Sequence, residues 1–208
     1  MKTLIAIPCM DTVHTLFFDA MLRLRFPADT QVVTSKSSLI YDARNMLARL
    51  AVEQDFDRVL WLDSDITFEP DLVERLSAAM DAGREFVTGL YFTRRAPIKP
   101  CVYEHCGMIL GSGGRPRPIA DSFTDIPEHV FQVAAAGFGG CMVSVDLIRR
   151  IAEKYGLPFS PITGFGEDLS FCLRATEMGV PLWCDPSIRL GHVGQVIFDQ
   201  NAWTASRR

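Results

Sequence analysis

The segment Val59-Leu-Trp-Leu-Asp63-Ser-Asp65 places four apolar residues directly before two carboxylates that are one residue apart. A short apolar run that ends at charged residues is typical of a buried strand. Two like charges at this spacing repel each other unless a cation or hydrogen-bond donors compensate them. We therefore expect a strand over 57–62 that is buried in a sheet and ends where Asp63 and Asp65 reach a polar edge.

Strands and helices alternate on either side of this segment. Apolar runs and helical spacing predict strands at 3–7, 31–34 and 85–91 and helices at 17–25, 43–51 and 71–82. This alternation predicts an α/β fold with a mostly parallel central sheet, helices on both faces and a small antiparallel part. Ligands of such folds bind beyond the carboxyl ends of the strands, which is where Asp63-Ser-Asp65 falls.

The second half of the chain repeats the pattern after an interruption. Residues 93–127 are rich in Pro, Gly and Arg and predict a hairpin or a mobile loop. Strands are expected at 130–135, 141–145, 182–184 and 188–190, and helices at 148–155 and from Glu167-Asp168 to Gly179. We expect one domain over 1–208, with a nucleotide-binding half at 1–92 and an acceptor and metal half at 93–208.

Composition excludes several other classes of protein. The 208 residues are 48% hydrophobic and 22% charged, which is typical of a packed domain and not of disorder. With 25 acidic against 21 basic side chains the net charge is −4, which argues against nucleic acid as a partner. No apolar stretch is long enough for a transmembrane segment or a secretory signal, so six cysteines predict reduced thiols in the cytoplasm.

Three groups of residues carry candidate chemistry, each with an ordinary structural alternative. Asp63 and Asp65 suit a divalent cation such as Mg²⁺ or Mn²⁺, or form a solvated turn. Glu167-Asp168 begins a helix, whose dipole would keep the pair ionised for use as a general base, or it merely caps that helix. His192, between Gly191 and Gly194, could complete a metal site, although a lone histidine is more often structural.

Two further segments leave their role open. Gly137-Phe-Gly-Gly140 either brings the backbone close to a ligand or turns a tight corner. Arg44 lies near the start of a helix, where its guanidinium suits a phosphate or carboxylate, or forms an exposed salt bridge with Asp42 or a neighbour.

The order of these motifs resembles nucleotide-sugar glycosyltransferases of the GT-A fold, specifically soluble, non-processive members similar to family 2. The ordered features are Ile7-Pro8, Ala43-Arg-Asn45, the Asp-x-Asp motif, a Gly-Gly strand, Gly-x-Glu-Asp opening a helix, and a late Gly-His. The resemblance spans roughly 3–194 and implies transfer of a hexose-type sugar from a UDP- or GDP-sugar to an acceptor hydroxyl, with Mn²⁺ or Mg²⁺ as cofactor.

The resemblance also implies residue roles. Catalysis falls to Asp168 and Glu167. Metal binding falls to Asp63, Asp65 and His192. Donor binding falls to the residues that would line the base, ribose, diphosphate and sugar subsites: Pro8, Cys9, Met10, Arg44, Asp63, Ser64, Gly139 and Gly140. We expect Arg94-Arg95 and the loop up to Pro118 to contact an acceptor whose identity the sequence does not give.

Two alternatives compete with this interpretation. Leu60-Trp-Leu-Asp63-Ser-Asp65-Ile-Thr67 also fits haloacid-dehalogenase-like phosphatases, in which Asp63 would be the phosphorylated nucleophile. That strand normally opens the catalytic core, whereas here two strands and two helices precede it. The other alternative is a non-catalytic module that binds a nucleotide sugar. The segment Thr34-Ser-Lys-Ser-Ser38 lacks the Asp that many glycosyltransferases use to hold the base, so the choice of base stays open.

Overall fold

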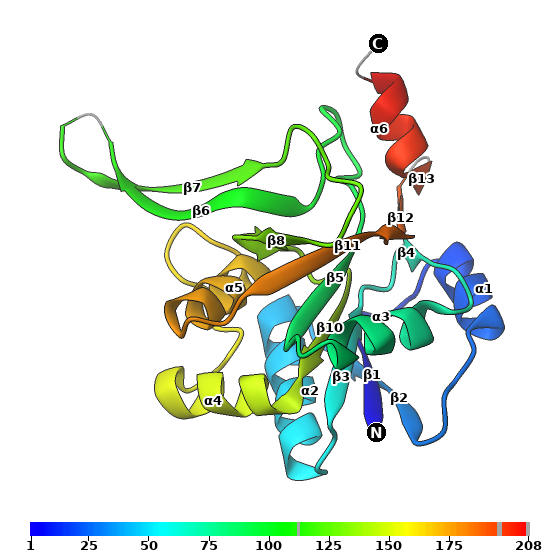
Figure 1. Cartoon of the computed structure of the whole chain (residues 1–208). Coiled ribbons are helices and arrows are strands. Elements are labelled where there is room, and N and C mark those ends of the chain that lie inside the picture. The colour runs from blue at the N-terminus through cyan, green and yellow to red at the C-terminus, as the bar shows by residue number, and fades with distance from the viewer. Residues whose placement is uncertain (112, 195–196, 207–208) are drawn as a thin grey trace.

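A computed structural model describes residues 1–111, 113–194 and 197–206. A seven-stranded sheet forms the centre of the molecule, in the order β2-β1-β3-β10-β5-β11-β8 (Figure 1). Its strands are β1 (Thr3–Cys9), β2 (Thr30–Lys36), β3 (Arg58–Leu62), β5 (Phe86–Leu90), β8 (Phe131–Val133), β10 (Gly140–Ser144) and β11 (Leu182–Arg189). The expected α/β class is confirmed.

The sheet is mostly parallel, as predicted. β2, β1 and β3 are parallel neighbours, and β5 pairs with β11 in parallel. β10 inserts between β3 and β5 and runs antiparallel to both, while β8 is an antiparallel edge strand. β10, from residues 93–208, therefore lies between two strands from residues 1–92 within a single sheet.

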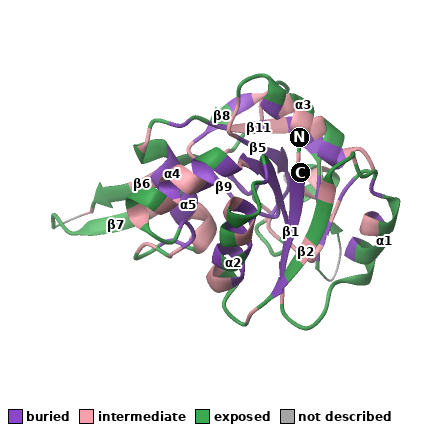
Figure 2. Ribbon diagram, turned by 90° about the horizontal axis from the view of Figure 1, so that it is seen from below, coloured by how far each residue is buried: buried purple, intermediate pink, exposed green. Residues whose placement is uncertain are grey.

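Helices cover both faces of this sheet. They are α1 (Thr15–Arg23), α2 (Ile40–Glu53), α3 (Leu72–Asp81), α4 (Val145–Tyr155) and α5 (Glu167–Glu177); a further helix, α6 (Gln200–Ser206), projects away from the sheet (Figure 1). α2, α4 and α5 pack on the face that contains Trp61, and α1 and α3 on the face that contains Leu60. Because β3 is buried on both faces, its residues from Val59 to Leu62 are all apolar, and Figure 2 shows central strands such as β1 in the colour of buried residues. Among the described residues, no helix is long and apolar enough to cross a membrane.

Two small antiparallel sheets complete the fold. One contains β4 (Ile66–Thr67), β12 (Gly191–Val193) and β13 (Ile197–Phe198), in the order β13-β12-β4. The other contains β6 (Val102–Leu110), β7 (Pro116–Ser122) and β9 (Ala135–Ala136), in the order β7-β6-β9. The β6–β7 hairpin projects from the body of the molecule (Figure 1), so residues 93–127 contain a hairpin and not only a loop.

Two local expectations were wrong, and some short elements were not predicted. Residues 130–135 are not one strand: the Ala134 N–H donates to the Tyr103 carbonyl (2.8 Å) where the chain leaves β8 and joins another sheet as β9. The two strands expected at 182–184 and 188–190 are one strand, β11, with an irregular register between Asp185 and Arg189. β4, β13 and α6 were not predicted because they are too short for a periodic signal.

Candidate functional site

A cavity of about 370 Å³ lies where the chain leaves β1 and β3, beside the starts of α2 and α5. Every predicted site residue lines this cavity except Gly139 and Gly140. The lining residues are Pro8, Cys9, Met10, Ser37, Ser38, Ile40, Arg44, Asp63, Ser64, Asp65, Arg94, Glu167, Asp168 and His192. Segments far apart in the sequence are therefore brought together as the motif order predicted.

The Asp63 carboxylate forms an ion pair with Arg44, which lies on α2. Arg44 Nη2 donates to Asp63 Oδ1 (2.7 Å), and Arg44 Nε donates to Glu167 Oε1 (3.2 Å) at the start of α5. One guanidinium thus bridges two of the predicted carboxylates. Burial raises the pKa of Asp63 even though Arg44 opposes the shift.

The Arg44 side chain is only 2% exposed, so it forms no exposed salt bridge with Asp42. Its guanidinium carbon lies 5.7 Å from the ring centre of Trp61 and 5.4 Å from that of Phe138, within cation–π range. Burial disfavours its charge, but Asp63 and Glu167 outweigh burial and raise its pKa. Its Nη1 is buried without a hydrogen-bond partner among the described residues, so the group keeps one unused donor.

Asp65 faces a different pair of groups. His192 Nε2 lies 3.6 Å from Asp65 Oδ2, and Arg94 Nη1 forms an ion pair with the same carboxylate oxygen. Burial opposes ionisation of Asp65, but the hydrogen bond and charge of His192, together with Arg94, lower its pKa. The Val193 N–H donates to the Asp65 carbonyl (2.8 Å), which fixes β12 beside the Asp-x-Asp motif.

A backbone carbonyl and an aromatic ring orient the His192 side chain. Its Nδ1 lies 2.9 Å from the Phe92 carbonyl oxygen. A carbonyl only accepts hydrogen bonds, so Nδ1 carries a proton; Nε2, which faces Asp65, interacts favourably with the carboxylate when it is protonated and has a lone pair for a metal ion when it is not. Tyr91 packs edge-on against the ring, with 5.7 Å between ring centres. A histidine held in this way has the tautomer that a metal ligand needs.

The glycines before β10 allow close internal packing. A Cβ at Gly137 would lie 2.0 Å from Tyr91 Oη, one at Gly139 would lie 2.9 Å from Tyr91 Cζ, and one at Gly140 would lie 2.3 Å from a methyl of Leu190. The Gly139 N–H also donates to Tyr91 Oη (3.1 Å). Close approach, and not only a tight corner, therefore explains these glycines. Neither Gly139 nor Gly140 is a lining residue of the cavity, and their contact with a donor sugar stays a prediction.

Asp168 lies in the first turn of α5, as predicted, and its pKa is raised and not lowered there. Burial and then the charge of Glu167 raise its pKa to about 6, although the Leu169 N–H donates to Asp168 Oδ1 (2.7 Å). Burial and a like charge outweigh the helix dipole in setting the direction of this shift, although a carboxylate with this pKa is still mostly ionised at neutral pH. A carboxylate with a pKa near the working pH is well suited to general base catalysis.

The donor set of this cavity fits a hard divalent cation in part. The Asp65 carboxylate and His192 Nε2 face each other and are ligand types that Mn²⁺ accepts. Asp63 instead faces Arg44, so its share in metal binding stays a prediction. Within the described ranges, no group of three or more His, Cys, Asp or Glu is arranged to hold an ion.

Sequence reasoning missed part of this site. Arg94 was expected to contact an acceptor, yet its partner is Asp65. Ser37, Ser38 and Ile40 also line the cavity, and only their position after β2 could have indicated this. A larger cavity of about 760 Å³ lies between α1 and α6, but none of the predicted site residues lines it.

Comparison with solved structures places the fold. The chain is similar to the protein A197 from STIV, with a TM-score of 0.66, 19% identity and coverage of 93% of this chain and 86% of that one. It is also similar to GalNAc-T7 solved with UDP, GalNAc and Mn²⁺, with a TM-score of 0.62, 11% identity and coverage of 93% and 43%. The chain has a GT-A-like fold. At such identities the likeness shows the fold alone, and no protein-family model and no curated protein matches this sequence.

Proposed function

We propose that this protein is a metal-dependent glycosyltransferase that moves a hexose-type sugar from a UDP- or GDP-sugar to an acceptor hydroxyl. One observation carries the proposal: a single cavity holds Asp65 opposite His192 and also contains Asp168, whose pKa is raised to about 6. Ligands for a cation and a general base are the two needs of glycosyl transfer. The bound UDP, GalNAc and Mn²⁺ of GalNAc-T7 support the same choice.

The donor would occupy the β1 and β3 side of the cavity. Pro8, Cys9 and Met10 would line the base, Asp63 and Ser64 would lie near the ribose, and Arg44 Nη1 is an unused donor for an anionic group. Asp65 and His192 would hold the divalent cation. When bound, that cation would act as a Lewis acid for the charge that develops on the departing diphosphate.

Asp168 would act on the acceptor. Its carboxylate takes the proton of the acceptor hydroxyl as that oxygen forms a bond to the anomeric carbon, and the bond from this carbon to the diphosphate oxygen breaks. Glu167 positions Arg44 through its 3.2 Å contact and keeps the pKa of Asp168 high through its charge. A cytoplasmic location stays a prediction of the sequence.

Donor binding and turnover test the proposal. We expect UDP- or GDP-sugars to raise the melting temperature only with MnCl₂, because a ligand stabilises the state it binds. Asp65→Asn and His192→Ala should abolish both this shift and release of the nucleoside diphosphate. Asp55→Asn is the control: Asp55 is exposed with a φ of 52°, which Asn tolerates.

Three outcomes separate the alternatives. Metal-dependent binding with release of UDP or GDP supports the transferase. Binding without release, in the presence of varied acceptors, supports the non-catalytic module. Phosphate release from p-nitrophenyl phosphate, lost in Asp63→Asn and without any nucleotide-sugar binding, would support the phosphatase.

A further inference from the structure

The two faces of the β6–β7 hairpin differ in chemistry. Directly paired residues of an antiparallel hairpin point to the same side. Three such pairs form one all-apolar side, which we name the apolar hairpin face: Cys106 with Ala120, Met108 with Pro118, and Leu110 with Pro116. The opposite side contains charged residues, through the pairs His105 with Asp121 and Ile109 with Arg117.

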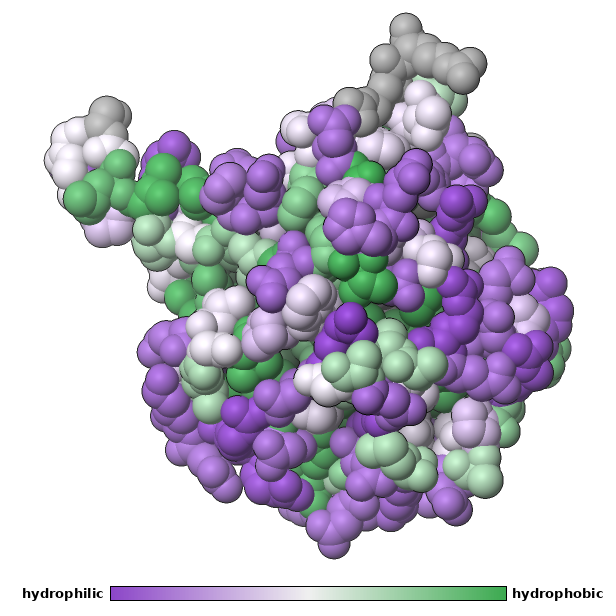
Figure 3. Space-filling view, viewed as in Figure 1, coloured by the Kyte–Doolittle hydropathy of each residue, from purple (hydrophilic) through white to green (hydrophobic). Residues whose placement is uncertain are grey.

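The outer part of the apolar hairpin face is open to solvent. Met108 is 51% exposed and Leu110 76% exposed, and Pro116, Pro118 and Ala120 are also exposed. Figure 3 shows hydrophobic residues gathered along the projecting arm. Contiguous exposed apolar surface is uncommon on a globular domain and marks a place where an apolar group docks.

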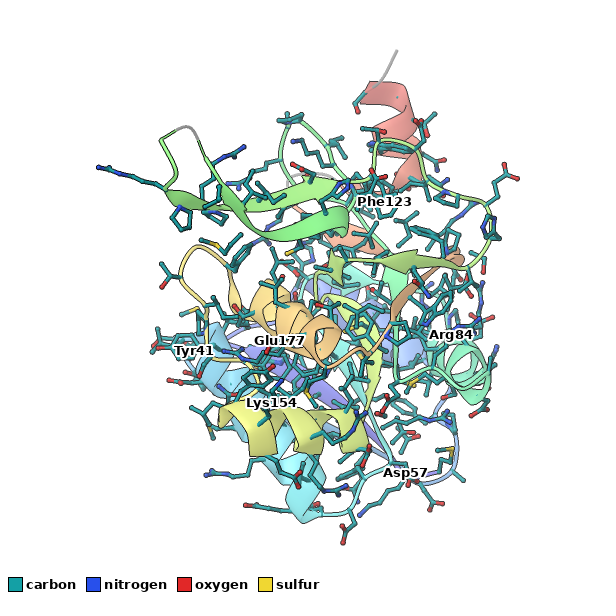
Figure 4. The ribbon with its side chains drawn as sticks, turned by 60° about the vertical axis from the view of Figure 1, so that its left-hand side comes forward. Tyr41, Asp57, Arg84, Phe123, Lys154 and Glu177 are labelled. Atoms are coloured by element: carbon teal, nitrogen blue, oxygen red, sulfur yellow. The ribbon has the colours of Figure 1, made fainter. Side chains whose placement is uncertain are left out.

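This face leads to the candidate general base. Cys106 is its innermost residue, and burial and then the charge of Asp168 raise the pKa of its thiol to about 11. Farther out, Pro118 packs on Gly164, where a Cβ would lie only 2.7 Å from Pro118 Cγ. Gly164 belongs to the loop that delivers Glu167 and Asp168 to α5, and Figure 4 shows the hairpin lying over that helix. The inner end of the apolar hairpin face is thus close enough to Asp168 to feel its charge, and its outer part contacts the loop before α5.

The chemistry of the face restricts what it can bind. A free sugar gives up hydrogen bonds with water when it docks, and it needs polar side chains to replace them. Apart from the weak Cys106 thiol, the three pairs of this face have no polar side chain and no aromatic ring; the next pair inward on the same side of β7 is Tyr103 with Ser122, so polar groups begin only at the inner end. A hydrocarbon group would gain from the same surface roughly 25 cal/mol for each Å² that leaves water.

We propose that the apolar hairpin face binds the body of an acceptor whose reacting hydroxyl is attached to a hydrocarbon group, and that the face leads this hydroxyl to Asp168. This inference rests on the proposed function, which it deepens by naming the acceptor class. The sequence predicted that residues 95–118 contact the acceptor, and the proposal assigns this contact mainly to the apolar hairpin face. Arg94 is not part of that surface, because its partner is Asp65.

The direct test uses n-octyl β-D-glucopyranoside below its critical micelle concentration and methyl β-D-glucopyranoside, which differ only in the hydrocarbon chain. Their effect is read from the NMR signals of ¹³C-labelled methionine methyl groups. Met108 on the face and Met46 on α2 are matched reporters, since they are 51% and 52% exposed. We expect the octyl compound alone to shift Met108, with no shift at Met46. Absence of a Met108 shift, or equal shifts at both methionines, would overturn the proposal.

Substitutions on the two hairpin faces give a second readout. Leu110→Gln with Met108→Gln should weaken octyl glucoside binding about 10-fold or more, since both apolar contacts are lost. Ile109→Gln is the matched control on the opposite face of the same strand and should change binding less than 2-fold. For the double variant, binding is followed at the methyl group of Ala120 by ¹³C-labelling of alanine. Equal weakening by Ile109→Gln would contradict the assignment.

Two controls keep the inference separate from its alternatives. A second copy of the chain on this face would make the Met108 signal depend on protein concentration without any probe, and sedimentation would show a dimer that Leu110→Gln dissociates; this result would overturn the proposal. Titration of UDP with MnCl₂, read at Met10 in the candidate cavity, tests the proposed function independently. Loss of that response with retention of the Met108 shift would reject the transferase and leave the apolar binding face.

Discussion

The two sides of the candidate cavity treat their carboxylates in opposite ways. Arg94 and His192 surround Asp65 and lower its pKa. No ion pair of Asp168 is found in the described structure, and burial together with Glu167 raises its pKa to about 6. Asp65 therefore stays ionised and can bind a cation, whereas Asp168 takes up a proton more readily. This difference separates a metal-and-donor side from a base-and-acceptor side.

The largest expected effect comes from removing the base. Asp168→Asn keeps the size of the side chain but cannot accept the acceptor proton, so sugar transfer should fall about 10³-fold. Binding of UDP with Mn²⁺, measured by calorimetry, should stay within 2-fold of the unsubstituted protein because Asp65 and His192 are intact. A comparable loss of UDP binding would show that the two sides are not separate.

The next effect concerns the buried cation that joins both sides. Arg44→Met leaves Asp63 and Glu167 without their shared partner, and removal of one member of a buried ion pair costs about 3–5 kcal/mol of unfolding free energy. Arg49→Met on the same helix is the control, since Arg49 is 71% exposed and should change stability by less than about 0.5 kcal/mol. Urea denaturation of both variants measures the difference. Equal stabilities would mean that Arg44 does not hold the site together.

The raised pKa of Asp168 predicts that its replacement stabilises the fold, whereas Arg44→Met destabilises it, and by a smaller amount. Its folded-state pKa of about 6 lies above the ordinary value of 3.8, so the folded protein loses stability as pH rises through this interval, by up to about 3 kcal/mol. Asp168→Asn should therefore be more stable than the unsubstituted protein at pH 7.5 and equal to it below pH 4. Thermal unfolding of both proteins across this pH range measures the difference in stability. The rate of sugar transfer should rise with pH up to about 6 and then level off.

The central fold and most of the site could be predicted from sequence for a physical reason. β3 is buried on both faces, so its residues from Val59 onward are apolar up to the point where the strand leaves the core at Asp63. Glycines beside His192 and before Glu167 mark places of close backbone approach, and these local signals indicated His192 and Glu167-Asp168 as site residues. Each signal depends on residues that are neighbours in the chain.

The interactions that set the ion pairs and pKa values of the site join residues that are far apart in the sequence. Arg44 and Glu167 are 123 positions apart in the sequence, and no local pattern pairs them. The ionisation of Asp168 depends on its burial, which outweighs the helix dipole and is a property of the folded chain. The same limit explains Arg94, whose basic neighbourhood indicated an acceptor contact although its partner is Asp65.

The smallest expected effect tests whether Arg94 and a metal ion compete for Asp65. The Arg94 side chain is 55% exposed, so its ion pair with Asp65 contributes at most about 1 kcal/mol. Arg94→Gln should tighten Mn²⁺ binding roughly 2- to 5-fold, because the ion no longer displaces a guanidinium from the carboxylate. Arg95→Gln, at the adjacent exposed position, should leave the affinity unchanged. Calorimetric titration with MnCl₂ distinguishes the cases: weaker binding in Arg94→Gln would mean that the arginine supports the metal side instead of occupying it.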